Sequence, residues 1–158
     1  MERVVKLYDA MSSLSSMEDI HRVVVVKIEN SGGLIDPKVQ LYASVLHEDY
    51  TFPVTASKAK YQKLPIDQVY VRMLHSAIRD HRVHLDVANM EEGIMKTVYT
   101  TSGVKAAEIY YLGATPRVLY VLSVASVTDG NVFNTPEYRL NCTMALEAIK
   151  KSLWSVRN

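Results

Sequence analysis

The sequence has few of the residues on which covalent cross-links, thiolate metal sites and strong surface fields depend. It contains one cysteine, Cys142, so neither an intrachain disulfide nor a thiolate metal cluster can form. The formal net charge is +1, which provides no overall field to attract nucleic acid or anionic lipid. No apolar run approaches the ~18–20 residues that a membrane-spanning helix needs. These absences argue against a disulfide scaffold, a nucleic-acid-binding protein and a membrane-spanning protein.

The N-terminal segment lacks the features of a targeting peptide. Residues 1–20 have no unbroken apolar core, and they contain acidic residues, which are scarce in transit peptides. Together with the single cysteine, this favours a reducing compartment, either the cytoplasm or an organelle interior. The apolar share of 48% and the charged share of 22% are ordinary for a globular protein. A chain of 158 residues then predicts a single α+β domain over positions 1–158.

A strong strand and a strong helix stand near the C-terminal end. The run 117–126, RVLYVLSVAS, is apolar or small on both alternating sets of side chains, which predicts a central strand covered on both faces. Thr135 is a suitable helix N-cap, with Pro136 at the first helical position. Helical spacing then produces one inward stripe, formed by Tyr138, Cys142, Ala145, Ile149, Leu153 and Val156.

The remaining elements complete an α+β pattern. Two further helices are predicted at 2–14 and 66–80, and the other predicted strands are 22–29, 39–47, 82–88, 94–101 and 106–112. The predicted order is therefore α-β-β-α-β-β-β-β-α. We predict a mainly antiparallel sheet of about six strands sandwiched by helices, with Val121 and Ile149 in the core.

The middle of the chain holds a concentration of possible metal ligands, namely His75, His81 and His84 with Asp80 and Asp86. Their spacing spreads them over a predicted helix, its end and the next strand. Zinc sites usually show tighter signatures, such as paired ligands on one helix face. A solvated polar face explains these residues better, so we predict no metal site.

No catalytic set stands at a recognisable spacing. Cys142 falls on the inward stripe of the last helix, which is typical of an inert core cysteine rather than a nucleophile. The polar residues His47, Glu48 and Asp49 could supply acid–base groups, but such a triplet at a strand end is more often a solvated turn. The glycine turns of the sequence fit no phosphate-binding fingerprint. We therefore predict no catalytic residue, no cofactor and, on balance, no enzymatic activity.

A small basic patch surrounds one aromatic residue. Lys58, Lys60 and Lys63 flank Tyr61, and such a group could touch an anionic partner or a nucleic-acid backbone. With a net charge so close to neutral, a solvated loop explains the lysines better.

Tyrosine is unusually frequent among the aromatic residues. There are ten tyrosines against two phenylalanines and one tryptophan, and the pair Tyr110-Tyr111 must place one ring on each face of a sheet. Exposed tyrosine and arginine are enriched in protein interfaces. The leading prediction is a non-catalytic protein–protein interaction module, a subunit or assembly factor of a larger complex. Its protein partner would bind a polar surface formed by Arg72, His75, Arg79, Arg82 and His84, although an outward helix face is ordinarily polar without any partner.

The alternative is a protein that binds a small molecule, as a receptor or an enzyme. An irregular segment, 47–65, follows the second predicted strand and carries the first aromatic cluster of the chain. The ligand would lie in a pocket between the sheet and this segment, lined by Tyr50, Phe52 and Tyr61.

The C-terminal third resembles a known family. The matching residues are the strand 109–112 (IYYL), the strand 117–126 and the end of the last helix, 149–154 (IKKSLW). They resemble the PsbP-like family, the extrinsic proteins of photosystem II, which pairs a YY-type strand with an R-x-LYxL strand before a last helix that ends in a hydrophobic–aromatic pair. The resemblance implies a PsbP-like α+β fold and carries no functional residue.

Overall fold

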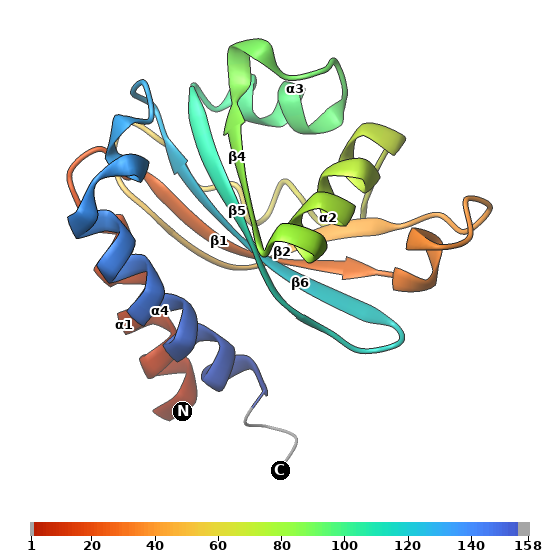
Figure 1. The fold of residues 1–158 in the computed structure, drawn as a ribbon, viewed down its shortest axis with the longest axis horizontal. Coiled ribbons are helices and arrows are strands. Elements are labelled where there is room, and N and C mark those ends of the chain that lie inside the picture. Colours follow the sequence, from red (N-terminus) through yellow and green to blue (C-terminus); the bar gives the residue numbers. More distant parts are fainter. Residues whose placement is uncertain (1, 155–158) are drawn as a thin grey trace.

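The computed structural model describes residues 2–154, in which a six-stranded antiparallel sheet lies between two pairs of helices (Figure 1). The strands are β1 (Arg22–Glu29), β2 (Tyr42–Tyr50), β3 (Leu64–Pro65), β4 (Arg82–Asp86), β5 (Ala106–Ala114) and β6 (Val118–Ser126). The helices are α1 (Glu2–Ser15), α2 (Gln68–Asp80), α3 (Ile94–Thr101) and α4 (Pro136–Trp154), with short 3₁₀ turns η1 (Ser31–Leu34), η2 (Val87–Asn89) and η3 (Asn131–Asn134). The strand order across the sheet is β3-β2-β1-β6-β5-β4.

The predicted α+β sandwich is confirmed, including the central place of the last strand. β6 pairs with β1 on one side and with β5 on the other, both antiparallel. Val121 on this strand and Ile149 on α4 are both in the core. A strand that is apolar on both faces can be accommodated only where both faces are covered, which is why this run occupies the middle of the sheet.

The predicted order of elements was wrong in one place: residues 94–101 form helix α3 and not a strand. The segment contains β-branched and aromatic residues, which favoured a strand. Its apolar side chains Ile94 and Val98, and likewise Met95 and Tyr99, are four residues apart, so a helix turns both pairs toward the sheet. The sixth strand is instead the two-residue β3, which pairs with the start of β2.

The two faces of the sheet carry separate cores. Helices α1 and α4 lie side by side over one face, whereas α2 and α3 cover the other (Figure 1). Tyr110 points into the core under α4, and its neighbour Tyr111 packs against the core under α2, as the alternation of a strand requires.

One carboxylate caps both helices of the second face. Asp67 is the N-cap of α2, where its Oδ1 accepts a hydrogen bond from the backbone N–H of Tyr70 at 3.0 Å. Its Oδ2 accepts from the N–H of Ile94 at 2.8 Å, at the start of α3. Helix α2 therefore begins at Gln68 after this cap, later than Pro65, where the sequence pattern placed its start. Asp67 fixes the relative position of the two helices because a single side chain satisfies both N-termini.

Helix α4 begins as predicted. The Oγ1 of Thr135 accepts a hydrogen bond from the backbone N–H of Tyr138 at 3.3 Å, so Thr135 caps the helix before Pro136. The predicted continuation to Val156 lies outside the described residues. Within residues 2–154, no helix combines the length and the apolar character that crossing a membrane requires.

Candidate functional site

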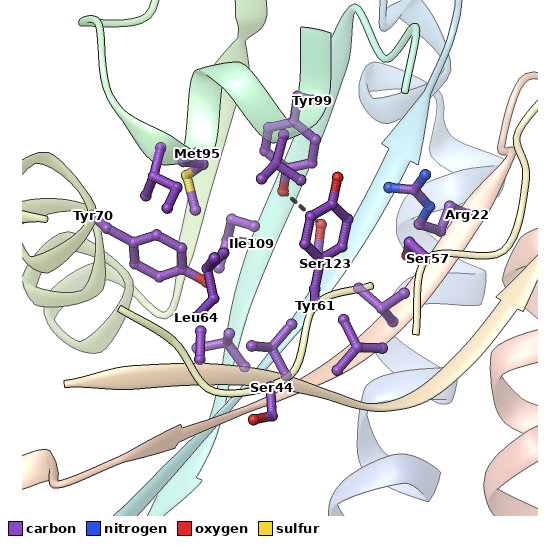
Figure 2. A pocket seen from close by; sticks show the side chains of 17 residues that line it. Arg22, Ser44, Ser57, Tyr61, Leu64, Tyr70, Met95, Tyr99, Ile109 and Ser123 are labelled. Atoms are coloured by element: carbon purple, nitrogen blue, oxygen red, sulfur yellow. Dashed lines mark hydrogen bonds between the residues drawn. The ribbon is translucent and has the colours of Figure 1, made fainter. Parts of the chain in front are cut away.

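A cavity of about 70 Å³ lies in the second core, between the sheet and the helices α2 and α3 (Figure 2). Its floor is formed by side chains of β1, β2, β5 and β6, namely Val24, Val26, Ala43, Val45, Ile109 and Val121. Its cover is formed by side chains of α2, α3, β3 and the segment between β2 and β3, namely Tyr61, Leu64, Tyr70, Ile94, Met95, Val98 and Tyr99. The lining is mostly apolar, with a few polar groups, which is the usual character of a small-molecule site.

The most unusual group in this lining is Arg22, the first residue of β1. Its side chain is buried, with 5% of the residue exposed, and its Nε has no hydrogen-bond partner among residues 2–154. Figure 2 shows the guanidinium at one end of the cavity, turned toward the ring of Tyr61. Burial lowers the pKa of Arg22, although the carboxylate of Glu48 opposes this shift. An arginine keeps its proton at any physiological pH, so this end of the cavity carries a buried positive charge whose Nε–H lacks an acceptor.

The nearest carboxylate is already occupied by other donors. Oε2 of Glu48 lies 3.8 Å from Nε of Arg22, which is an ion pair beyond hydrogen-bond length. The two oxygens of Glu48 accept instead from the backbone N–H of Ser57 at 3.0 and 2.9 Å, from the hydroxyl of Ser57, and from the N–H of Lys58 at 3.1 Å. Glu48 therefore holds the segment that covers the cavity, and it leaves Arg22 without a hydrogen bond.

Three tyrosines line the cavity, with Tyr61 and Tyr99 toward Arg22 and Tyr70 toward the other end (Figure 2). The hydroxyl of Tyr99 shares a 2.7 Å hydrogen bond with the hydroxyl of Ser123 on β6 (Figure 2). The hydroxyl of Tyr70 makes no hydrogen bond to another described residue. Burial raises the pKa of both tyrosines, so they stay protonated and can donate. Together with Arg22, they make the polar part of the lining rich in donors.

The residues predicted to line a pocket are divided by the structure. Tyr61 lies in the cavity wall, where the sequence interpretation placed it. Tyr50 and Phe52 are 44% and 92% exposed and lie outside the lining. The segment between β2 and β3 thus contributes Ser57 and Tyr61 to the site, and β3 contributes Leu64.

The residues predicted to bind a partner do not form one surface. On the α2 side, Arg72 pairs with Glu91 at 2.7 Å and Arg79 pairs with Asp80 at 3.0 Å, and His75 is exposed. Arg82 and His84 lie on β4, and their side chains point to the face of the sheet that α4 covers, away from α2. There they contact the buried carboxylate of Glu108.

Glu108 is the centre of a hydrogen-bonded network under α4. Its carboxylate is fully buried and receives Arg82 Nε at 2.8 Å, His84 Nδ1 at 2.8 Å and the Tyr110 hydroxyl at 2.7 Å. The hydroxyls of Tyr110 and Tyr138 are 2.8 Å apart. This network lies next to Cys142, whose thiol pKa is raised by burial, as expected for an inert core cysteine. No group of three or more potential metal ligands is assembled anywhere in residues 2–154.

Comparison with solved structures places this architecture in a known fold. The far-red cyanobacteriochrome photoreceptor is similar over 99% of this chain and 88% of its own, with a TM-score of 0.68 and 11% identity. The GAF domain of a two-component sensor histidine kinase from Bacillus halodurans is similar over 97% of this chain and 94% of its own, with a TM-score of 0.65 and 11% identity. The phycocyanobilin-bound GAF domain of a cyanobacterial phytochrome is similar over 98% and 95%, with a TM-score of 0.62 and 11% identity.

The chain has the GAF fold. At these identities the likeness establishes the fold and not a shared activity. No family model matches the sequence, and no curated protein is similar to it.

Two predictions from the sequence are corrected by these findings. The PsbP-like resemblance is wrong, because structures with the GAF fold match the whole chain, whereas a strand–strand–helix pattern recurs in many α+β folds. The leading prediction of an interaction module or assembly factor is also wrong. The findings favour the alternative, since several structures with this fold hold a bilin chromophore and a mostly apolar cavity lies beneath α2 and α3 here.

The sequence interpretation missed Arg22, Tyr70 and Tyr99. A signal for Arg22 was present, because a formal charge opens the run RVVVVKIE, which was predicted to be buried. Burying a charge in such a strand costs free energy unless an opposite charge or a hydrogen-bond acceptor compensates it. The tyrosines gave no comparable signal, since a buried tyrosine is common in any core.

Proposed function

We propose that this chain is a small-molecule-binding domain of the sensor type, with its ligand in the cavity beneath α2 and α3. The single observation that carries the proposal is Arg22, a buried guanidinium with no hydrogen-bond partner among residues 2–154, at the end of a mostly apolar cavity. Buried polar groups are normally satisfied. A hydrogen-bond acceptor on a ligand would supply the partner that Nε of Arg22 lacks in the folded chain.

A bilin does not fit this site, although the phytochrome neighbours bind one. Drug-sized ligands occupy pockets of about 300–1,000 Å³, and an open-chain tetrapyrrole is at least that large, whereas the cavity here is about 70 Å³. The one cysteine of the chain, Cys142, lies in the core on the other face of the sheet, so no thiol faces the cavity to attach a chromophore. The ligand of this chain is therefore small.

A thermal-shift screen of small metabolites tests the proposal. A ligand at one hundred times its Kd adds about 2.7 kcal/mol to stability, which for a chain of this size raises Tm by roughly 5–10 °C. The variant Val98→Phe fills the cavity from the half-buried side of α3, and it should abolish the shift.

The matched control is Thr97→Phe, which adds the same ring to the exposed side of α3 and should leave the shift unchanged. Equal shifts in wild type and Val98→Phe for every hit would refute binding in this cavity. A broad screen without any hit on the wild type would count against the proposal as a whole.

A further inference from the structure

The charge balance of the cavity restricts what it can bind. Among the described residues of its lining, Arg22 is the one with a formal charge. Its neighbour Glu48 is engaged by Ser57 and Lys58, as described above, and lies 3.8 Å away. The guanidinium therefore has a counter-charge in Glu48 but N–H donors, Nε among them, that no described residue accepts. A neutral acceptor would satisfy the donors, but a carboxylate would form the stronger, charge-assisted hydrogen bonds.

The other polar groups of the cavity point to the same ligand chemistry. The Tyr70 hydroxyl is a donor without a partner among residues 2–154. Tyr99 and Ser123 share one hydrogen bond, so one of the two hydroxyl protons stays available. Each of these hydroxyls can donate or accept, whereas the guanidinium can only donate, so the group that meets Arg22 must carry lone pairs. A carboxylate has this character, and its planar shape matches the fork of an arginine.

The dimensions of the cavity limit the rest of the molecule. An engineered cavity of roughly 150 Å³ accommodates benzene, and the cavity here is about half as large at about 70 Å³. Apart from the groups next to Arg22, the wall consists of aliphatic and aromatic side chains such as Val24, Val121 and Ile109. A tail of a few carbons fits this space, whereas a second charge would lie in an apolar wall or close to Glu48.

We infer that the ligand is a short-chain monocarboxylate, whose carboxylate pairs with Arg22 and whose apolar tail lies between Tyr61, Tyr99 and the sheet. The inference rests on the proposed function and adds the ligand class to it. Binding forms two hydrogen bonds from the guanidinium to the carboxylate, and it gives the guanidinium the acceptors that Glu48, at 3.8 Å, does not supply. Because the guanidinium accommodates one such group, dicarboxylates and neutral analogues bind less tightly.

The experiment compares matched probes at pH 7 and constant ionic strength by titration calorimetry and thermal shift. The probes are propionate, butyrate and valerate, with butyramide and succinate as the neutral and dianionic analogues. Butyrate should bind at one site, and butyramide and succinate should bind at least about tenfold more weakly, which corresponds to the loss of one charge-assisted hydrogen bond.

Arg22→Gln keeps a polar side chain but removes the charge, and it should weaken butyrate binding by about 10- to 100-fold. Arg22→Met is the second variant, in case glutamine perturbs the strand. Val98→Phe should abolish the binding of every probe. Arg79→Gln, at an exposed ion pair on α2, is the matched control and should bind butyrate like the wild type.

The outcomes distinguish a failure of the carboxylate inference from a failure of the proposed function. If butyramide binds as tightly as butyrate, or if both Arg22 variants keep full affinity for butyrate, the carboxylate inference is overturned. If neutral molecules bind in a manner that Val98→Phe abolishes while no carboxylate binds, the inference fails and the proposed function stands. If no probe or library compound binds in that manner, both fail.

Discussion

Two charged side chains are buried on opposite faces of the same sheet, and their surroundings differ completely. Glu108, under α4, is fully buried and receives Arg82, His84 and Tyr110 at 2.7–2.8 Å. Arg22, under α2 and α3, is 5% exposed, and its Nε meets no acceptor in the described chain. The carboxylate of Glu108 receives hydrogen bonds from three side chains, whereas Arg22 has an ion pair with Glu48 at 3.8 Å and no hydrogen bond at Nε.

The contrast separates a structural role from a functional one. A buried carboxylate surrounded by donors ties β4, β5 and α4 together, because each of these elements contributes to its network or packs against it. A buried guanidinium without hydrogen bonds lowers stability, since the desolvation of its N–H groups is not compensated. This missing hydrogen bond at the end of a cavity is the observation on which the proposed ligand site rests.

Among the tests of this comparison, alkaline pH should cause the largest change in the free energy of unfolding. Burial raises the pKa of two tyrosines on each face, Tyr70 and Tyr99 beside the cavity and Tyr110 and Tyr138 beside Glu108. The unfolded chain ionises these hydroxyls near pH 10, whereas the folded chain keeps them protonated, so stability falls as pH rises. Between pH 10 and 11 we expect a loss of about 1 kcal/mol for each of Tyr70, Tyr110 and Tyr138 and a further loss from Tyr99, measured by urea unfolding.

Two variants distinguish the faces in that experiment. Tyr70→Phe should reduce the alkaline loss at little cost at pH 7, because the Tyr70 hydroxyl has no partner among the described residues. Tyr110→Phe should also reduce the alkaline loss, but at a cost at pH 7, because it removes a donor from Glu108. If the two variants lost equal stability at pH 7, the hydroxyls on the two faces would not differ in their contribution to the fold, contrary to this prediction.

Glu108→Gln should have the next largest effect. The substitution preserves shape but removes the charge that Arg82 and His84 surround, and we expect a loss of about 3 kcal/mol in the free energy of unfolding. Glu147→Gln breaks an exposed ion pair with Lys151 on the outside of α4 and should change stability by less than about 0.5 kcal/mol. A Glu108 variant as stable as the Glu147 variant would show that the network is not structural.

Asp67→Ala should cost about 2 kcal/mol, because it removes the acceptor for the N-termini of both α2 and α3. Amide hydrogen exchange should increase in these two helices and not in α1 or α4, since only the cavity face depends on this cap. Asp36→Ala, at an exposed turn where the carboxylate accepts from the N–H of Lys38, is the control. Increased exchange in α4 to the same degree would mean that the two faces do not behave independently.

The double variant Arg22→Met, Glu48→Gln should have the smallest effect. Replacing both members of a buried ion pair with uncharged side chains is often neutral or stabilising, so we expect the stability of the unliganded protein to stay within about 1 kcal/mol of the wild type. Arg22→Met alone should lower stability, because it leaves the buried carboxylate of Glu48 without its cation. Thermal unfolding of the three proteins without ligand measures this, and a large loss of stability in the double variant would indicate that the ion pair at 3.8 Å is important to the fold.

Much of the fold follows from local patterns in the sequence. The β-branched run RVVVVKIE, the apolar residues on both faces of the 117–126 strand and the stripe from Tyr138 to Ile149 predict elements that the structure contains. Such patterns are reliable because burial of one face requires a fixed period, whichever partner covers that face. The sequence also indicated that the segment after β2 could cover a pocket, and Tyr61 of this segment does line the cavity.

Other features depend on which segments meet in space. Helix α3 forms where local preferences favoured a strand, because Asp67, distant in sequence, caps its first turn and the sheet receives its apolar side. Tertiary packing also decides which buried charge is satisfied: β4 and α4 bring donors to Glu108, whereas β2 brings Arg22 a carboxylate that the covering segment already occupies. The sequence by itself therefore determined the periodic elements and the faces they bury. Only the tertiary structure decided where a charge is left unsatisfied, because hydrogen-bond satisfaction depends on contacts between residues far apart in the chain.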